Sequence, residues 1–309
     1  MSELNIRADS SSPTELNPVA QFFAMLYRDK FALAATFILL VILLFALIGP
    51  ELIGDIAGKQ NLRGRNAPPF SLNQGWAFVL GADALGRPIL PRIIVAARNT
   101  MLIAGASVTF AMLVGTSLGL IAGYTSKMTS QIIMRLADVI MSFPSLLLAV
   151  IVLYMLESSI FNLVLVLAFT RIPIYLRTTR AEVLEIRERM FVQAARVMGA
   201  SDRRIVLRHI LPVVLPTLVT IATLDFAYVM LAESSLSFLG IGIQPPEVTW
   251  GLMVAQGRPY LANAWWLALF PGLAIVITTM SLTLLSGWMR TALDPVQRWR
   301  LEVGSKTSV

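Results

Sequence analysis

The chain has 309 residues, of which 56% are hydrophobic and 14% charged, and its mean hydropathy is +0.73. A soluble domain usually carries about 25% charged residues, so the composition excludes an ordinary water-soluble globular protein and indicates a membrane protein. The chain has no cysteine and one histidine, His209, which excludes disulfides, thiolate metal sites and histidine clusters. In a membrane protein, the net charge of +7 indicates basic loops beside anionic lipid rather than a nucleic-acid partner.

The N-terminal region is expected to hold a tail and then a first membrane span. Residues 1–30 are polar and are predicted to form a cytoplasmic tail. Residues 31–49 carry no charge, and about 20 apolar residues suffice for a helix to span the hydrocarbon. This run starts too far from the N-terminus for a cleaved signal, so we expect a retained first transmembrane helix at the periphery of the bundle. Residues 50–98 are then predicted to form an outer, periplasmic loop.

Five further spans are predicted, and together they make a core over residues 99–290. The third of the six spans contains Pro144 as an expected kink, and the fourth reaches span length only if it continues past Arg171 and Pro173. Residues 291–309 are predicted to form a second cytoplasmic tail. The five core spans are expected over residues 99–126, 139–156, 158–176, 210–232 and 259–289.

The distribution of basic residues predicts the orientation. Six spans place both termini on the same side of the membrane. Lys and Arg are more numerous in the tails and connections that share this side, with a dense group of Arg over residues 171–208. The positive-inside rule therefore predicts that both termini are cytoplasmic.

Three glycines at a spacing of four lie in the second predicted span. Gly115, Gly119 and Gly123 share one face of a helix and would let a neighbouring backbone approach closely. We expect a packing seam within the bundle here, with a direct part in a solute path as the alternative.

The longest connection expected on the cytoplasmic side has a helix–turn–helix pattern over about 188–212. Residues 190–198 are amphipathic, Gly199 favours a helix end, a second short helix fits 202–210, and Pro212 opens the next span. One interpretation is a basic loop that binds anionic headgroups. The other is a docking elbow, in which the small residues Ala194 and Ala195 let a groove of another protein approach the backbone.

These residues resemble the EAA loop of ABC importer permeases, in which the loop forms the helices that dock in a groove of the ATPase. The matching residues are Gln193, Ala194, Ala195, Gly199, Ala200, Leu211 and Pro212. Further segments resemble, in order, the dipeptide/oligopeptide/nickel branch of that family and its C-type permease subunit: 80–87, 143–149, 232–240, 245–251 and 267–274. Two residues depart from the pattern. Gln193 stands in place of the usual Glu but keeps its size and hydrogen bonding, and Pro88 stands in place of the usual Asp.

The resemblance implies an all-α integral membrane protein with six transmembrane helices and the type I importer permease fold. It implies half of a translocation pathway for di- or oligopeptides, or a related small solute, that works by alternating access in the bacterial inner membrane. The implied partners are a second homologous permease, two ABC ATPase subunits, a periplasmic solute-binding protein and membrane lipid. The chain has no P-loop motif, so we expect no catalytic site and no cofactor in it, with ATP and Mg²⁺ bound by the ATPases.

Two acidic residues lie in or near the fifth predicted span. An acid in hydrocarbon is costly and usually faces protein interior or water. Asp225 and Glu233 are therefore candidates for the solute path, with internal hydrogen bonds between helices as the alternative and a structural or gating role favoured for Glu233. Arg171 either partners an acid or, as favoured, extends to the inner surface.

Two other classes of function remain open from the residues. The main alternative is an ion-gradient-driven secondary transporter that uses Asp225 and Glu233 as proton or sodium sites. A third class is a membrane scaffold that recruits a soluble partner through the elbow.

Overall fold

The computed structural model describes residues 18–293, and helices make up most of that range. No β-strand forms in it, and one isolated bridge pairs Ala82 with Pro88. The predicted all-α class is confirmed. The outer parts of the two predicted tails, residues 1–17 and 294–309, lie outside the described residues.

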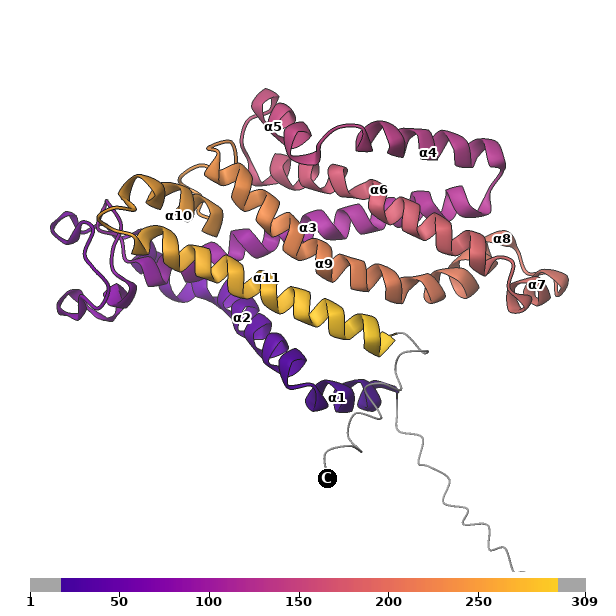
Figure 1. The fold of residues 1–309 in the computed structure, drawn as a ribbon, viewed down its shortest axis with the longest axis horizontal. Coiled ribbons are helices and arrows are strands. Elements are labelled where there is room, and N and C mark those ends of the chain that lie inside the picture. The colour runs from indigo at the N-terminus through magenta and orange to yellow at the C-terminus, as the bar shows by residue number, and fades with distance from the viewer. Residues whose placement is uncertain (1–17, 294–309) are drawn as a thin grey trace, which may run out of the picture.

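The first long helix lies at the edge of the bundle (Figure 1). The chain bends at Asp29, between α1 (Pro18–Arg28) and α2 (Lys30–Gly58). The Asp29 carboxylate accepts hydrogen bonds from the N–H groups of Phe31 and Ala32 at 3.0 and 3.1 Å. This side-chain cap starts α2 because it pairs two N–H groups that have no partner within the helix. Only 17% of the most apolar stretch of α2 is buried, so most of it is left for lipid.

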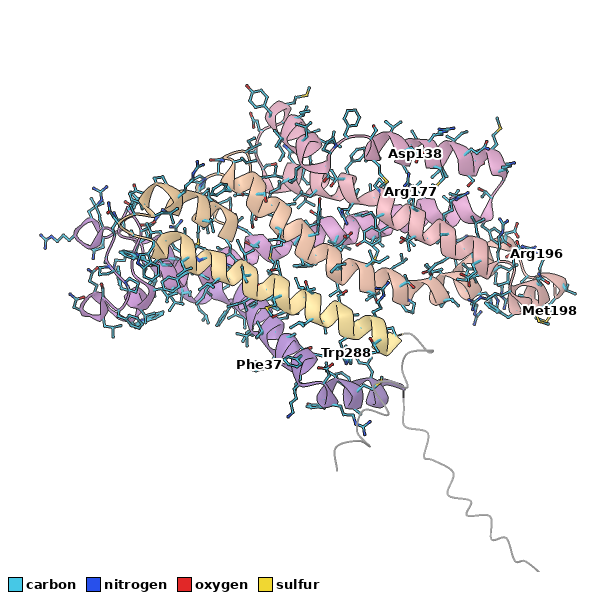
Figure 2. All side chains as sticks on the ribbon, viewed as in Figure 1. Phe37, Asp138, Arg177, Arg196, Met198 and Trp288 are labelled. Atoms are coloured by element: carbon cyan, nitrogen blue, oxygen red, sulfur yellow. The ribbon has the colours of Figure 1, made fainter. Side chains whose placement is uncertain are left out.

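α1 is held against the end of the last helix by a small apolar cluster. The ring of Phe22 packs edge-on against Trp288, with centroids 4.9 Å apart. The buried residues of this cluster are Met25, Leu26, Ala32, Trp288 and Ala292. Figure 2 shows Trp288 beside α1.

The predicted outer loop is shorter than expected at both ends. α2 continues through Pro50 to Gly58, and α3 (Ile89–Tyr124) begins well before residue 99. Between them, residues 59–88 contain three short 3₁₀ helices at Leu62–Gly64, Leu72–Gln74 and Trp76–Leu80. α3 has 36 residues, so it is roughly 54 Å long and extends beyond the hydrocarbon. Arg92 and Arg98 interrupt the apolar sequence at its start, but the helix includes them.

The glycine seam of α3 packs against α6 (Ile160–Ile186), as predicted. A Cβ added at Gly115, Gly119 or Gly123 would lie 2.6 Å from a Cβ of α6, those of Tyr175, Thr179 and Val183 respectively. Glycine is therefore required at each position for the two backbones to approach this closely.

The third predicted span is two helices rather than one kinked helix. α4 (Lys127–Met141) and α5 (Ser145–Met155) meet at a break where the axis turns by 82°. Pro144 causes the break because it lacks an N–H and disfavours helical geometry at the residue before it. The predicted boundaries 139–156 are thus wrong. α5 alone, with 11 residues, is too short to span the hydrocarbon.

The fourth and fifth spans are longer than predicted. α6 passes through Pro173 and continues to Ile186, so Arg177 lies in a helix and forms an ion pair with Asp138 of α4, which it faces in Figure 2. α9 (Leu211–Phe238) extends past residue 232.

The last part of the described chain crosses the bundle once more. α10 (Trp250–Gly257) is a short helix that the apolar pattern did not predict. A 3₁₀ turn, Arg258–Tyr260, follows it. α11 (Trp266–Leu293) is the final long helix, so the predicted start of its span at residue 259 is too early. In residues 18–293, five helices are long and apolar enough to cross a membrane, and the α4–α5 pair makes up to six, which agrees with the prediction.

Candidate functional site

The predicted elbow consists of short helical segments that turn at Gly199. α7 (Met190–Val197) ends where Gly199 takes a φ of +83°. The N–H of Ala200 donates to the carbonyl of Ala195 at 3.1 Å, and the N–H of Gly199 donates to that of Arg196 at 3.0 Å. These bonds form a Schellman motif, which glycine enters without the strain that a Cβ adds.

The second arm of the elbow is continuous with a membrane span. α8 (Asp202–Ile205) passes through one π-helical turn (Val206–Ile210) into α9. Leu211 begins α9, and Pro212 lies in its first turn, where a missing N–H costs least. Because helical backbone runs from Asp202 to Phe238, a displacement of the elbow would be carried into the bundle.

α7 has one face in the core and one bare face. Val192 and Ala195 belong to the main core, whereas Met190, Val197 and Met198 are 86%, 88% and 82% exposed. Large apolar side chains left bare together are typical of a contact surface. Arg196 and Met198 lie at the α7 end of the molecule in Figure 2.

The two alanines of the elbow have different surroundings. Ala194 is exposed beside the exposed Gln193, whose amide donates to the carbonyl of Glu188 at 3.1 Å. Ala195 is buried. Ala194 is therefore the alanine whose side chain is open to the surface, and Ala195 packs in the core.

Tyr124, a residue that sequence reasoning missed, fastens the elbow to the end of α3. Its hydroxyl donates to a carboxylate oxygen of Asp202 in α8 at 2.8 Å and accepts from Arg196 of α7 at 3.3 Å. The Arg196 guanidinium also lies 6.0 Å from the centre of the Tyr124 ring. One side chain thus holds both arms. Its position directly after Gly123 at the end of the seam is the one signal in the sequence that could have pointed to it.

Asp225 is buried in α9 and pairs with a charge from α6. Both Nε, at 3.3 Å, and Nη2 of Arg171 donate to its carboxylate. The guanidinium also lies 4.2 Å from the ring centre of Tyr228, whose hydroxyl is hydrogen-bonded to that of Ser145 at the start of α5 at 2.9 Å. The favoured prediction that Arg171 extends to the inner surface is wrong, because a buried carboxylate beside it supplies a partner within the protein.

Glu233 lies in a second, separate polar cluster at the far end of α9. It is 1% exposed. Its Oε1 accepts from the hydroxyls of Ser237 at 2.7 Å and Thr249 at 2.8 Å. Thr249 also caps α10 by accepting the N–H of Leu252 at 3.1 Å. Glu233 therefore joins α9 to α10 through internal hydrogen bonds.

The two acidic residues of α9 do not form one site. Asp225 and Glu233 lie about 12 Å apart along the helix axis, and each carboxylate has its own partners. By contrast, the predicted residues of the elbow are brought together. Among residues 18–293, no group of three His, Asp or Glu side chains is placed to hold a metal ion.

A third polar cluster lies at the end of the molecule opposite the elbow (Figure 1). Oδ2 of Asp83 accepts from Nε of Arg87 and from Nη1 of Arg92, both at 2.7 Å. Oδ1 accepts the N–H groups of Leu85 and Arg87 at 2.9 and 2.8 Å. Nη2 of Arg92 donates to Gln256 of α10 at 3.1 Å. The Asp83 carboxylate thus ties the loop to α3, and Arg92 extends the network to α10.

A family model described as the binding-protein-dependent transport system inner membrane component matches residues 115–299, more than half of the chain. The chain belongs to this family. The matched part of this inner membrane component begins at the first glycine of the seam and includes the elbow and the whole of α11. A second model, the N-terminal transmembrane domain of oligopeptide transport permease C, matches residues 17–69. The resemblance to importer permeases of the peptide branch is confirmed.

Curated relatives match nearly the whole length of this inner membrane component. It is 36% identical to the di/tripeptide transport system permease protein DppC of Pseudomonas aeruginosa over 94% of this chain and 96% of the relative. It is 34% identical to the probable D,D-dipeptide transport system permease protein DdpC of Escherichia coli, over 89% and 91%. It is 35% identical to the glutathione transport system permease protein GsiD of Pectobacterium atrosepticum, over 90% and 91%.

A solved structure supports the fold. A chain of the inward-facing MetNI methionine ABC transporter aligns with a TM-score of 0.57 and 18% identity, covering 67% of this inner membrane component and 98% of that chain. At this identity the match concerns the fold alone, and it agrees with the expected type I importer permease fold.

Proposed function

We propose that this inner membrane component forms half of the solute pathway of an ATP-driven importer and that the elbow couples it to the ATPases. The observation that carries the proposal is the elbow itself. Its first helix has a bare apolar face, its turn is fixed by the Schellman motif at Gly199, and its second arm runs directly into α9. A rigid elbow of this kind would transmit a movement of a soluble partner to α9 in the membrane.

The proposed orientation has the elbow and both termini in the cytoplasm. Arginine is concentrated around the elbow and the end of α6, which the positive-inside rule favours for the cytoplasmic side. The loop at 59–88 and α10 would then lie on the periplasmic side, where a solute-binding protein delivers its cargo.

The proposed assembly contains a second, homologous permease, two ABC ATPases and the binding protein. ATP and Mg²⁺ would be bound by the ATPases, and this chain would need no cofactor or catalytic residue of its own. ATP binding would draw the two elbows together, and α9 would tilt with the elbow to open the pathway to the other side.

The proposed solutes are dipeptides, longer peptides or related small molecules. The names of the relatives, which concern di- and tripeptides, D,D-dipeptides and glutathione, support this class. A gradient-driven carrier has little support by comparison. Its two candidate ion sites are already engaged, Asp225 by Arg171 and Glu233 by hydroxyl groups.

The test is purification of the tagged full chain from its native membranes, with identification of the co-purifying proteins. We expect a second permease and P-loop ATPases. Replacing exposed residues of the elbow with acids, in the variant Ala194→Glu with Met198→Glu, should release the ATPases while the second permease stays bound. Leu62→Glu, an exposed apolar position at the other end of the molecule, is the matched control and should release neither. Recovery of the chain alone in a mild detergent would sink the proposal.

A further inference from the structure

A cavity of about 380 Å³ lies beside Asp83 at the end of the molecule opposite the elbow. Its volume is within the range of about 300–1,000 Å³ that is usual for small-molecule pockets. Part of its wall is polar, from Asp83, Arg87, Arg92 and Gln256. Apolar side chains and Tyr260 form the rest, with Leu85, Ile89, Met253 and Leu267 among them.

The charges that line this cavity do not cancel. Arg87 and Arg92 contribute two positive charges, whereas Asp83 is the one acid among the residues that line it. The Arg87 and Arg92 side chains are 23% and 7% exposed, so solvent only partly screens the surplus positive charge. A net positive charge in a half-open, partly apolar cavity favours an anion.

The carboxylate of Asp83 has no capacity left to neutralise more charge. Its two oxygens already accept from two backbone N–H groups, from Nε and Nη2 of Arg87 and from Nη1 of Arg92. Arg87, by contrast, uses one side of its guanidinium, and within residues 18–293 no hydrogen bond from its Nη1 is found. Asp83 therefore holds the two arginines in place and leaves donor groups of Arg87 for a second anion.

We propose that this cavity binds a carboxylate that carries an apolar group, with Arg87 as its main charged contact. A guanidinium pairs well with a carboxylate because its N–H groups match the two oxygens. Leu85, Met253 and Leu267 would pack against the apolar part. Two sources share this chemistry, the C-terminal residue of a peptide solute and an acidic side chain of a docking protein. The first source rests on the proposed function, whereas the carboxylate site itself does not.

The first experiment measures binding of N-acetylleucine to the purified full chain in lipid nanodiscs by calorimetry. N-acetylleucinamide is the matched neutral probe, which differs at the carboxylate alone. We expect the acid to bind and the amide to bind at least tenfold more weakly, as for loss of a charge-assisted pair. Equal affinity for both probes, or no binding of the acid, would overturn the proposal. The measurement uses neither ATP nor transport, so its failure would leave the proposed function standing.

Three variants locate the site. Arg87→Met removes the charge at similar length, and Leu85→Trp fills the cavity without touching an ion pair. Both should lower the affinity for N-acetylleucine about tenfold or more, whereas Arg258→Met, which removes an arginine that lies over Phe238 outside the cavity, should leave it unchanged. Should Arg87→Met unfold the loop, Leu85→Trp still decides the matter. Unchanged affinity in Leu85→Trp would mean that the acid binds elsewhere and would refute the site.

Two further arms distinguish the sources of the carboxylate. If the solute supplies it, N-acetylleucine competes with peptides that have a free C-terminus, and the binding protein docks equally well to wild type and Arg87→Met. If the binding protein supplies it, N-acetylleucine weakens docking, and Arg87→Met weakens it as well. Each result supports the carboxylate site, and the absence of both effects counts against it.

Discussion

Arg171 and Asp225 illustrate what a buried charge costs at the scale of single residues. Each charge would be expensive alone in the interior, and the pair is tolerable because the guanidinium meets the carboxylate directly and packs on the ring of Tyr228. The pair also links α6 to α9, the helix that continues from the elbow. Removing the pair is therefore expected to affect the stability of the protein first.

The single variant Asp225→Leu should destabilise the protein far more than the double variant. It leaves Arg171 buried without its carboxylate, which costs about 3–5 kcal/mol. Arg171→Leu with Asp225→Leu removes both charges and should restore most of the loss. Thermal unfolding of the three proteins in one detergent provides the measurement. A single variant as stable as wild type would show that the pair is not buried as described.

Tyr124→Phe should weaken coupling while leaving the fold intact. It keeps the ring beside Arg196 but removes the hydroxyl that binds Asp202 and Arg196. Losing hydrogen bonds to charged partners at this half-buried position corresponds to about 1 kcal/mol, or roughly fivefold in the balance between a held and a released elbow. Solute transported per ATP hydrolysed in proteoliposomes should fall. Tyr154→Phe, the same change at an 86% exposed position of α5, is the control and should leave the ratio unaltered.

At the scale of helices, the glycine seam brings the backbones of α3 and α6 close together. This close packing fixes the second half of α3 against α6, so Tyr124 at the end of α3 is a fixed attachment point for the elbow. Arg187 adds to this anchor, because its Nη1 donates to the carbonyl of Gly123 at 3.0 Å.

Gly119→Ala should destabilise the bundle by about 1–3 kcal/mol, the usual cost of overpacking. The new Cβ would lie 2.6 Å from the Cβ of Thr179 and 2.7 Å from the carbonyl oxygen of Leu176, and backbone cannot move aside as a flexible side chain can. Gly287→Ala in α11 is the matched control, since a Cβ there meets nothing within 4 Å. That control should be neutral or stabilising, as alanine is the better helix former. Equal unfolding temperatures for the two variants would contradict the seam.

Gly199→Ala should loosen the turn of the elbow by about 1–2 kcal/mol, the cost of placing a Cβ residue in left-handed geometry. No atom lies within 4 Å of the new Cβ, so any effect comes from backbone conformation and not from a clash. We expect fewer ATPase subunits to co-purify with the variant. Gly199→Asn should lose fewer ATPase subunits than Gly199→Ala, because asparagine tolerates the left-handed conformation better. An equal loss for both variants would argue against a conformational cause.

At the scale of the whole molecule, the elbow and the Asp83 cluster lie at opposite ends of the bundle (Figure 1). The proposed orientation therefore predicts opposite accessibility. The chain has no cysteine, so Met198→Cys and Leu72→Cys, both at exposed positions, provide single labels without background.

A membrane-impermeant maleimide should label Leu72→Cys in intact spheroplasts and Met198→Cys only in inverted vesicles. The wild-type chain, which cannot react, is the control for both preparations. The reverse labelling pattern would show that the topology is inverted and that the elbow lies on the periplasmic side, away from any cytoplasmic ATPase.

Much of the fold follows from the sequence because the constraint that shapes it is local. A membrane requires long uncharged helices, and a run such as residues 31–49 meets that requirement without reference to any other part of the chain. The glycines of the seam and the turn at Gly199 are likewise readable, because each depends on the backbone near one residue.

Contacts between distant residues could not be predicted from the sequence. Arg171 meets Asp225, Arg92 meets Gln256, and Tyr124 meets Asp202, although each pair lies far apart in the chain. No local pattern records which of several buried charges will meet, because that depends on how whole helices pack. A membrane-spanning helical protein with a helix–turn–helix elbow was therefore predictable from local patterns, whereas the packing of whole helices settles which polar groups are engaged and where a cavity remains.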